Sequence, residues 1–218
     1  MSEVLSAMDG DVRVLTLNRP DKANAMNEAM QIALVEKLSG SGAVVIAASG
    51  SRIFSAGADL KEFSELERSV AAKKRRALLR RTLNAILDYP APLIVAVQGK
   101  ALGAGAMVAL LADELIMADT AELGLPEIKH GIPTPVGYAI VAARAGMPVA
   151  RRMVQDGEPV GPGLADYVSE VDSLKEKSLE RARALAALPA EAYRINKKFI
   201  NAQMKSALAA AFAEADKA

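Results

Sequence analysis

The 218-residue chain contains no cysteine, and His130 is its only histidine. The absence of cysteine excludes disulfides, thiolate metal ligands and cysteine nucleophiles. A single histidine excludes a multi-histidine metal site and argues against a catalytic triad built on serine, histidine and aspartate. We therefore expect no metal site.

The chain also lacks an excess of one charge and a long apolar run. Its 27 basic and 26 acidic residues give a net charge of +1, which indicates neither nucleic acid nor membrane as a partner. No apolar run is long enough to span a bilayer, and Met1–Gly10 shows no secretory pattern. We expect a cytoplasmic protein, and its length suits one compact domain with a sizeable core.

A unit of buried strand, glycine-rich turn and helix occurs twice. In the first, the strand Ala43–Ala48 precedes the turn Phe54–Ala58 and a helix expected from about Asp59. In the second, the strand Leu93–Val97 precedes the turn Gly99–Gly105. The other expected elements are the strands Val12–Leu17 and Leu115–Ala118 and the helices Glu28–Leu38 (capped by Asn27), Leu66–Leu87 and Ala106–Ala112. This alternation predicts an α/β fold.

The last third has a different pattern. Gly157–Gly163 is rich in glycine and proline and indicates a boundary or a loop, and the helices Leu174–Leu188 and Ala190–Ala215 are expected beyond it. The second helix carries one apolar face, typical of a core or a subunit interface: Ile195, Phe199, Leu208 and Phe212. We therefore divide the chain into an α/β core, residues 1–150, and a helical C-terminal region, residues 151–218.

The glycine-rich turns have two interpretations. A turn that leads into a helix presents unbonded N–H groups, so two facing turns could form an oxyanion hole. The other interpretation is that small residues merely allow close packing of strand and helix. Neither turn has the spacing of a phosphate-binding loop or of a dinucleotide fingerprint.

Glu127 is a carboxylate in an apolar stretch that includes Leu123, Leu125 and Ile128. Burial there would raise its pKa and suit it to proton transfer near neutral pH. The alternative is a loop residue that is exposed or paired in a salt bridge.

Several strings together resemble the enoyl-CoA hydratase/isomerase (crotonase) family. They are Asn18–Pro20, Asn24–Asn27, Phe54–Lys61, Gly99–Ala109, Asp113 and Pro126–Ile128, in the family's order and at its spacings. The resemblance covers residues 10–145 well and the C-terminal third only loosely. It implies a crotonase-like spiral of ββα turns with a helical C-terminal part that closes the site and assembles homotrimers or dimers of trimers.

The resemblance also implies site residues for an acyl-CoA thioester, with no cofactor beyond the coenzyme A of the substrate. The N–H groups of Ala58 and Ala104 would bind the thioester oxygen, and Glu127 would move the proton. Substrate-binding positions would be Lys22, Ala23, Ala25, Ala56, Asp59, Leu60, Lys61 and Met107.

At two positions the sequence departs from the family's pattern, and these departures reduce the number of candidate reactions. Met107 stands where hydratases of the family generally carry a first glutamate, and Pro135 stands near a further acidic position of some members. One carboxylate suffices to move a proton from C2 to C4 of a 3-enoyl thioester, so the resemblance favours a Δ3,Δ2-enoyl-CoA isomerase. A hydratase working with Glu127 alone, and a lyase, decarboxylase or carbon–carbon bond former, remain alternatives.

A second class of function is indicated by the basic residues Lys73–Arg76, Arg80 and Arg81. Such a cluster on a helix can bind RNA, but it also fits the solvated face of a helix whose other side is buried. We expect the solvated face and therefore no nucleic acid partner. RNA binding and a catalytically silent family member stay as alternatives.

Overall fold

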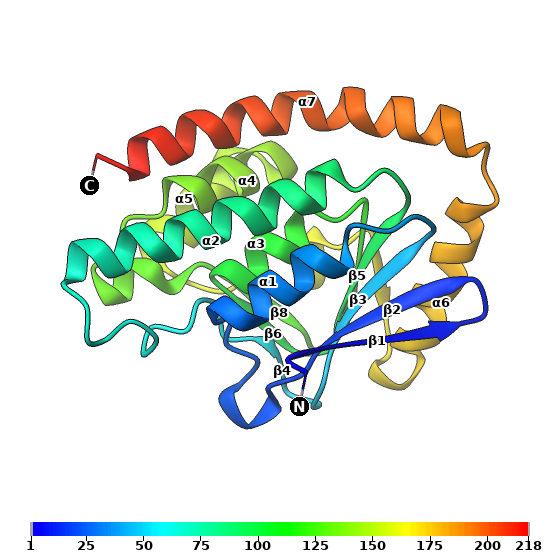
Figure 1. Cartoon of the computed structure of the whole chain (residues 1–218), viewed down its shortest axis with the longest axis horizontal. Helices are drawn as coiled ribbons and strands as arrows, with labels where there is room; N and C mark the ends of the chain where they lie inside the picture. The colour runs from blue at the N-terminus through cyan, green and yellow to red at the C-terminus, as the bar shows by residue number, and fades with distance from the viewer. Residues whose placement is uncertain (1, 218) are drawn as a thin grey trace.

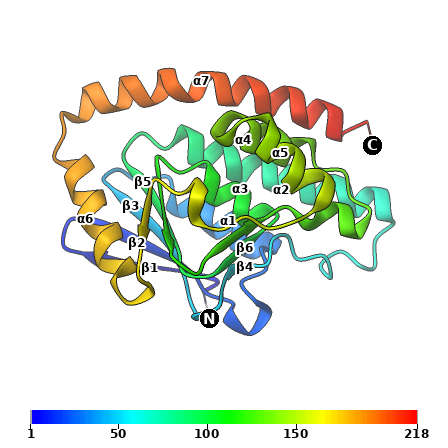
Figure 2. The ribbon, with the colours of Figure 1, turned by 180° about the vertical axis from the view of Figure 1, so that it is seen from behind.

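The computed structural model describes residues 2–217, and two sheets organise it (Figures 1 and 2). The larger sheet has the strand order β1-β2-β3-β5-β7-β9, and the smaller has the order β4-β6-β8. The larger sheet is formed by β1 (Val4–Asp9), β2 (Val12–Leu17), β3 (Val44–Ala48), β5 (Leu93–Val97), β7 (Glu114–Ala118) and β9 (Tyr167–Ser169). The smaller sheet is formed by β4 (Ile53–Ser55), β6 (Lys100–Leu102) and β8 (Glu122–Gly124).

The larger sheet is parallel except at β1. β1 and β2 form an antiparallel hairpin, and from β2 onward each strand runs parallel to the next, with Val44 opposite Leu93 and Ile94 opposite Glu114. Every residue of β5 is buried, as expected for an apolar run without alternation. Helices α1 to α3 lie on one side of this sheet and α6 on the other (Figures 1 and 2).

Successive strands alternate between the two sheets. β3, β5 and β7 belong to the larger sheet, and each is followed at once by β4, β6 or β8 of the smaller sheet. A helix then follows each pair: α2 (Arg68–Asp88), α3 (Ala104–Leu110) and, after a 3-10 turn, α4 (Pro135–Ala145). This confirms the predicted α/β fold with repeated ββα turns.

The expected helices form with small differences at their ends, with one exception. Asn27 caps α1 (Glu28–Lys37), because its side chain accepts a hydrogen bond from the Met30 N–H. The helix expected from about Asp59 is absent. The chain makes turns there instead, with Phe63 at φ +66°, and α2 begins only at Arg68.

The C-terminal region needs one correction, because it is not wholly helical. β9 pairs with β7 and extends the larger sheet, so part of residues 151–218 belongs to the core architecture. α5 (Met147–Arg151) leads into this region, whose other elements are the π-helical turn Arg152–Asp156, the 3-10 turns Pro162–Leu164 and Val171–Ser173, α6 (Leu174–Ala186) and α7 (Ala190–Ala215). The assignment of this region to oligomerisation and site closure stays a prediction.

Helix α7 lies along one edge of the molecule and packs on α2 and α4 (Figure 1). The predicted apolar face, typical of a core or a subunit interface, is buried within this chain only in the second half of α7. Leu208 and Phe212 are buried, whereas Ile195 and Phe199 are exposed, Phe199 by 80%. No helix in residues 2–217 is long and apolar enough to cross a membrane.

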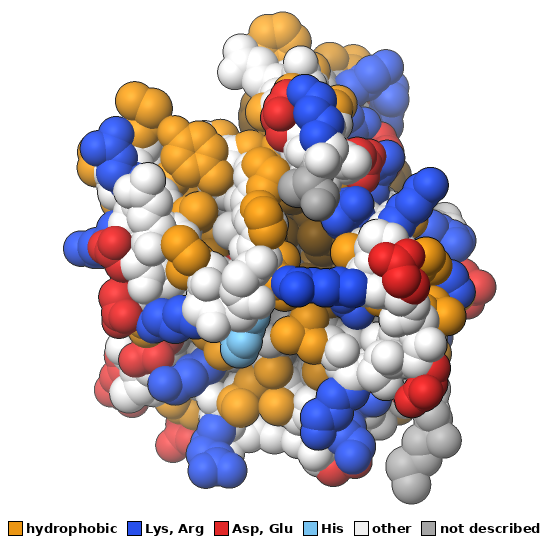
Figure 3. Space-filling view, turned by 90° about the vertical axis from the view of Figure 1, so that its left-hand side faces the viewer, with side chains coloured by type: hydrophobic (Ala, Val, Ile, Leu, Met, Phe, Trp, Pro, Cys, Tyr) orange, Lys and Arg blue, Asp and Glu red, His pale blue; other side chains and the backbone are white. Residues whose placement is uncertain are grey.

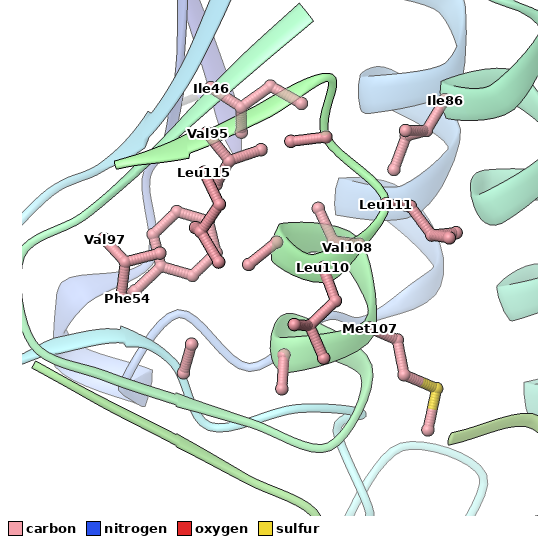
Figure 4. Packing of buried hydrophobic residues seen from close by; sticks show 14 of the residues in the cluster. Ile46, Phe54, Ile86, Val95, Val97, Met107, Val108, Leu110, Leu111 and Leu115 are labelled. Carbon is pink, nitrogen blue, oxygen red and sulfur yellow. The ribbon is translucent and has the colours of Figure 1, made fainter. Parts of the chain in front are cut away.

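The core forms where strand side chains meet α3. Ile46, Val95 and Leu115 from three parallel strands lie in one group with Phe54 of β4, and Val108 of α3 faces them (Figure 4). Met107 leaves α3 on the side away from Phe54 (Figure 4). This packing fixes the start of α3, where the functional residues gather.

Candidate functional site

The two glycine-rich turns lie against each other. Gly57 has φ +92°, and a β-carbon added to it would lie 2.8 Å from the Leu102 carbonyl oxygen and 3.4 Å from the Ala104 nitrogen. No other residue type fits this approach, because that β-carbon would overlap the backbone of the second turn. The close contact brings Ala58 and Ala104 to adjacent positions.

Both predicted donors have free N–H groups among the described residues. Ala104 is the first residue of α3, so its N–H has no acceptor within the helix. Ala58 forms a bridge with Met26, but the bridge uses the neighbouring groups: the Met26 N–H donates to Gly57, and the Asp59 N–H donates to Met26. Because no helix starts at Asp59, the first donor comes from a turn and has no helix dipole behind it.

Glu127 reaches the same place from β8. It lies in the short 3-10 helix Pro126–His130, which Pro126 starts and Gly131 ends at φ +67°. A β-carbon added to Gly103 would lie only 3.0 Å from Oε1 of Glu127, so the carboxyl group rests against the residue before Ala104.

The surroundings of Glu127 favour its protonated form. Its Oε2 is buried and has no hydrogen-bond partner among the described residues, and no salt bridge involves it there. Burial raises the pKa of the Glu127 carboxyl group from 4.5 to about 7, and a contact with its own backbone N–H offsets only part of that rise. The alternative of an exposed or salt-bridged residue is therefore wrong.

Met107 occupies a closed position. It is 3% exposed, and a β-carbon added to Gly137 of α4 would lie 3.1 Å from its terminal methyl and 2.9 Å from Leu125. The thioether therefore packs between α3 and α4, beside the strand end that leads to Glu127. Pro135 is the first residue of α4 and supplies no polar group.

The predicted coenzyme A segment is joined to the first turn. The Ala56 N–H donates to the Ala23 carbonyl at 2.9 Å, and Ala23 adopts a left-handed backbone at φ +52°. Ala56 and Lys22 are exposed, and Ala25 is partly buried. These residues therefore line the outside of the turn that carries Ala58.

The residues after Ala58 separate into two groups. Asp59 is held by Arg19, whose guanidinium lies 3.0 Å from the carboxylate and also donates to the Ala25 carbonyl at 2.6 Å. Leu60, 47% exposed, and Lys61 lie at the surface, and among the described residues no hydrogen bond or salt bridge joins Lys61 to Glu127. His130 is exposed as well, in agreement with its exclusion from the predicted site.

Arg19 is a residue that sequence reasoning missed as part of the site. It connects the opening segment to the residue after the first donor. The only signal was its place in the string Asn18–Pro20, which does not reveal the distant partner Asp59.

Four of the six basic residues in the predicted cluster on α2 have partners within the protein. Arg76 and Arg80 both bind Asp216 at the end of α7, and Arg75 donates to a backbone carbonyl. Lys74 lies over the ring of Phe63. These contacts explain the cluster as a support for α7 and the 59–66 turns, and they weaken the RNA-binding alternative.

Figure 3 shows the face at the left of Figure 1, where the surface has a hollow with hydrophobic side chains in it and charged side chains nearby. Across residues 2–217 no group of three or more acidic or histidine side chains is arranged to hold a metal ion. The site therefore combines two peptide N–H donors and one buried carboxyl group.

Comparisons with known proteins identify the family of this chain. The family model described as enoyl-CoA hydratase/isomerase matches residues 8–217. The chain is 34% identical to 2,3-dehydroadipyl-CoA hydratase of Escherichia coli over 98% of its length and 88% of the relative's. It is 31% identical to carboxymethylproline synthase of Pectobacterium carotovorum over 88% of its length and 81% of the relative's.

Solved structures give the same result. The crystal structure of an enoyl-CoA hydratase/isomerase from Mycobacterium paratuberculosis superposes with a TM-score of 0.89 at 26% identity, over 100% of this chain and 92% of the other. The match in sequence and fold places this chain in the enoyl-CoA hydratase/isomerase family of acyl-CoA enzymes.

Proposed function

We propose that this protein is a Δ3,Δ2-enoyl-CoA isomerase that moves a proton with Glu127 alone. The observation that carries the proposal is the single buried carboxyl group against the facing turns, with Met107 packed where a second carboxylate would stand. A hydratase needs to activate water as well as deliver a proton, and a thioether can do neither.

The proposed reaction begins with proton abstraction. Glu127, ionised, takes a proton from C2 of a 3-enoyl thioester. The enolate oxygen accepts hydrogen bonds from the Ala58 and Ala104 N–H groups, and each such donor contributes roughly 3 kcal/mol to the stability of the transition state. Glu127 then returns the proton to C4.

The pKa of Glu127 suits this double role. At a pKa of about 7 the carboxyl group is both a competent base and a competent acid near neutral pH. Its buried Oε2 has no protein partner in the described part of the chain, so no protein hydrogen bond would compete there with a substrate.

Coenzyme A is proposed to lie outside the first turn. Lys22 and Lys61 are both exposed, and their ammonium groups can attract phosphates. Asp59 and Leu60 complete the channel leading to Ala58. Met107 forms the wall of the acyl pocket together with Leu125.

A second candidate follows from the names of the relatives. Several are called hydratases, and one is a carboxymethylproline synthase, so hydration by Glu127 alone or carbon–carbon bond formation from the same enolate is the alternative. Both reactions would use the same oxyanion site, and they differ in the group that reacts with the bound thioester: water in hydration and a carbon centre in bond formation.

We also propose a homotrimer or a dimer of trimers. Leu188, Ile195, Phe199 and Ile200 are exposed around the start of α7, and exposed large apolar side chains at this density are typical of subunit interfaces. Light scattering should give at least three times the mass of the chain. A monomer that keeps its activity would contradict the proposal.

The test of the reaction uses two substrates in parallel. With 3-hexenoyl-CoA the absorbance of the 2-enoyl thioester should rise, and with crotonyl-CoA it should stay constant. Glu127→Gln should abolish the rise while thioester binding persists, and Glu158→Gln, a surface carboxylate 60% exposed, is the matched control. Loss of crotonyl-CoA absorbance would identify a hydratase, and no change with either would exclude both.

A further inference from the structure

Ser55 stands at the junction of the two donor turns, and its hydroxyl group is fully buried. Its Oγ donates to the Asn24 carbonyl at 2.9 Å and accepts from the Gly57 N–H at 3.2 Å. Both hydrogen bonds are therefore made to backbone groups of segments that the proposed site uses.

The backbone at Gly57 needs such restraint. Glycine is the most permissive residue, and Gly57 adopts φ +92°. Two hydrogen bonds hold it: the Gly57 carbonyl accepts from the Met26 N–H at 2.8 Å, and the Gly57 N–H donates to Ser55. The peptide planes on both sides of Gly57 are thereby fixed, and the second plane carries the Ala58 N–H.

Ser55 also touches the second turn. A β-carbon added to Gly105 would lie 2.6 Å from the Ser55 β-carbon and 2.9 Å from its Oγ. The first turn of α3, where Ala104 donates, therefore rests directly on the Ser55 side chain. One side chain thus contacts the backbones of both turns.

We propose that Ser55 is a positioning residue whose hydroxyl group orients the Gly57–Ala58 segment so that the Ala58 and Ala104 N–H groups converge on one thioester oxygen. The inference rests on the proposed oxyanion function. Ser55 does not touch the substrate, and it acts through the geometry of the two donors.

Ser55→Ala separates the packing of the Ser55 β-carbon from the hydrogen bonds of its hydroxyl group. The β-carbon contact with Gly105 remains, whereas the Gly57 N–H and the Asn24 carbonyl lose their partner. A donor displaced by a fraction of an ångström to 1 Å costs up to roughly 100-fold in rate, so we expect kcat to fall roughly 10- to 100-fold with KM changed less than about threefold.

The decisive measurement is the carbonyl stretch of bound butyryl-CoA labelled with ¹³C at the thioester. This saturated thioester cannot isomerise, so the reading does not depend on turnover. Hydrogen bonds to the carbonyl oxygen lower its stretching frequency, and in Ser55→Ala the band should move back toward that of free butyryl-CoA.

Ser178→Ala is the matched control. Ser178 is also fully buried, and its hydroxyl group donates to a backbone carbonyl within α6, away from the site. Both variants should lose stability, but only Ser55→Ala should shift the carbonyl band and lower kcat. Equal effects of the two variants would reduce Ser55 to a structural role and overturn the inference.

The remaining outcomes separate the inference from the proposed function. A lowered carbonyl frequency in the wild type that persists in Ser55→Ala overturns the role of Ser55 alone. No lowering in the wild type overturns the oxyanion site and the inference together. A lowering that Ser55→Ala reverses, without turnover of 3-hexenoyl-CoA, supports Ser55 and excludes the isomerase. If Ser55→Ala does not fold, Ser55→Cys replaces it, because a thiol is a weaker hydrogen-bonding group than a hydroxyl. Its carbonyl frequency should lie between those of the wild-type complex and free butyryl-CoA, with a lowered kcat, and a wild-type frequency and kcat in Ser55→Cys overturn the inference.

Discussion

Replacing Glu127 with glutamine should change how the stability of this protein depends on pH. In the unfolded chain the carboxyl group titrates near 4.5, and in the folded chain burial raises its pKa to about 7. Between these values the folded state holds a proton that the unfolded state has lost. The free energy of unfolding of the wild type therefore falls as pH rises through this window and levels off above pH 7.

The magnitude follows from the shift. For a single group titrating at 4.5 unfolded and about 7 folded, the wild type should lose about 2.5 kcal/mol between pH 5 and pH 8. Glu127→Gln carries no ionisable group there and should lose that much less. The comparison between two pH values cancels the constant cost of placing an amide in the site.

Urea unfolding at pH 5 and pH 8, followed by circular dichroism, measures this difference. Glu158→Gln serves as control because its carboxylate is exposed, and it should keep the wild-type pH dependence. The reasoning is refuted if wild type and Glu127→Gln lose the same free energy between the two pH values. That result would mean that the buried carboxyl group is not destabilised as an anion.

Three further predictions concern the site and its support. The kcat/KM for a 3-enoyl thioester should rise about tenfold per pH unit below pH 7 and level off above it, because Glu127 must be ionised to act as base, and a flat profile from pH 5.5 to 8 would contradict this. Met107→Glu should create measurable hydration of crotonyl-CoA, and it should lower the free energy of unfolding by roughly 2–4 kcal/mol, because it buries a charge at a position 3% exposed. A folded Met107→Glu variant without hydration would show that the lack of a second carboxylate is not what prevents hydration. Lys197→Met should lower the free energy of unfolding, measured with denaturant, by roughly 3 kcal/mol, because Asp113 loses the buried ammonium group that lies 2.6 Å from its carboxylate. A loss below about 1 kcal/mol would mean that this ion pair does not anchor α7.

The local elements could be predicted because their signals are local. Apolar runs such as Leu93–Val97 are typical of strands buried on both faces, and Asn27 is typical of a helix cap. Both predictions are confirmed within a residue or so. The burial of Glu127 was left open by its apolar neighbours in the sequence, because they fit an exposed or salt-bridged loop residue as well, and the structure decided it.

Errors arose where distant segments decide the backbone. The helix expected from Asp59 does not form, because the bridge between Met26 and Ala58 and the left-handed Phe63 impose turns. The extent of burial along α7 was likewise not visible in the sequence: Leu208 and Phe212 are buried whereas Ile195 and Phe199 are exposed, and periodicity cannot show how far neighbouring helices cover a face.

The sequence by itself determined the chemistry that is available: one carboxylate amid apolar residues, two small-residue turns, and no histidine pair or thiol to compete with them. Only the tertiary structure decided that these parts meet. Gly57 and Gly103 follow strands β4 and β6, which pair as neighbours in the smaller sheet, and Glu127 follows β8, the next strand along. The pairing of parallel strands brings the segments after their ends to one edge, and this places the carboxyl group beside the two donors.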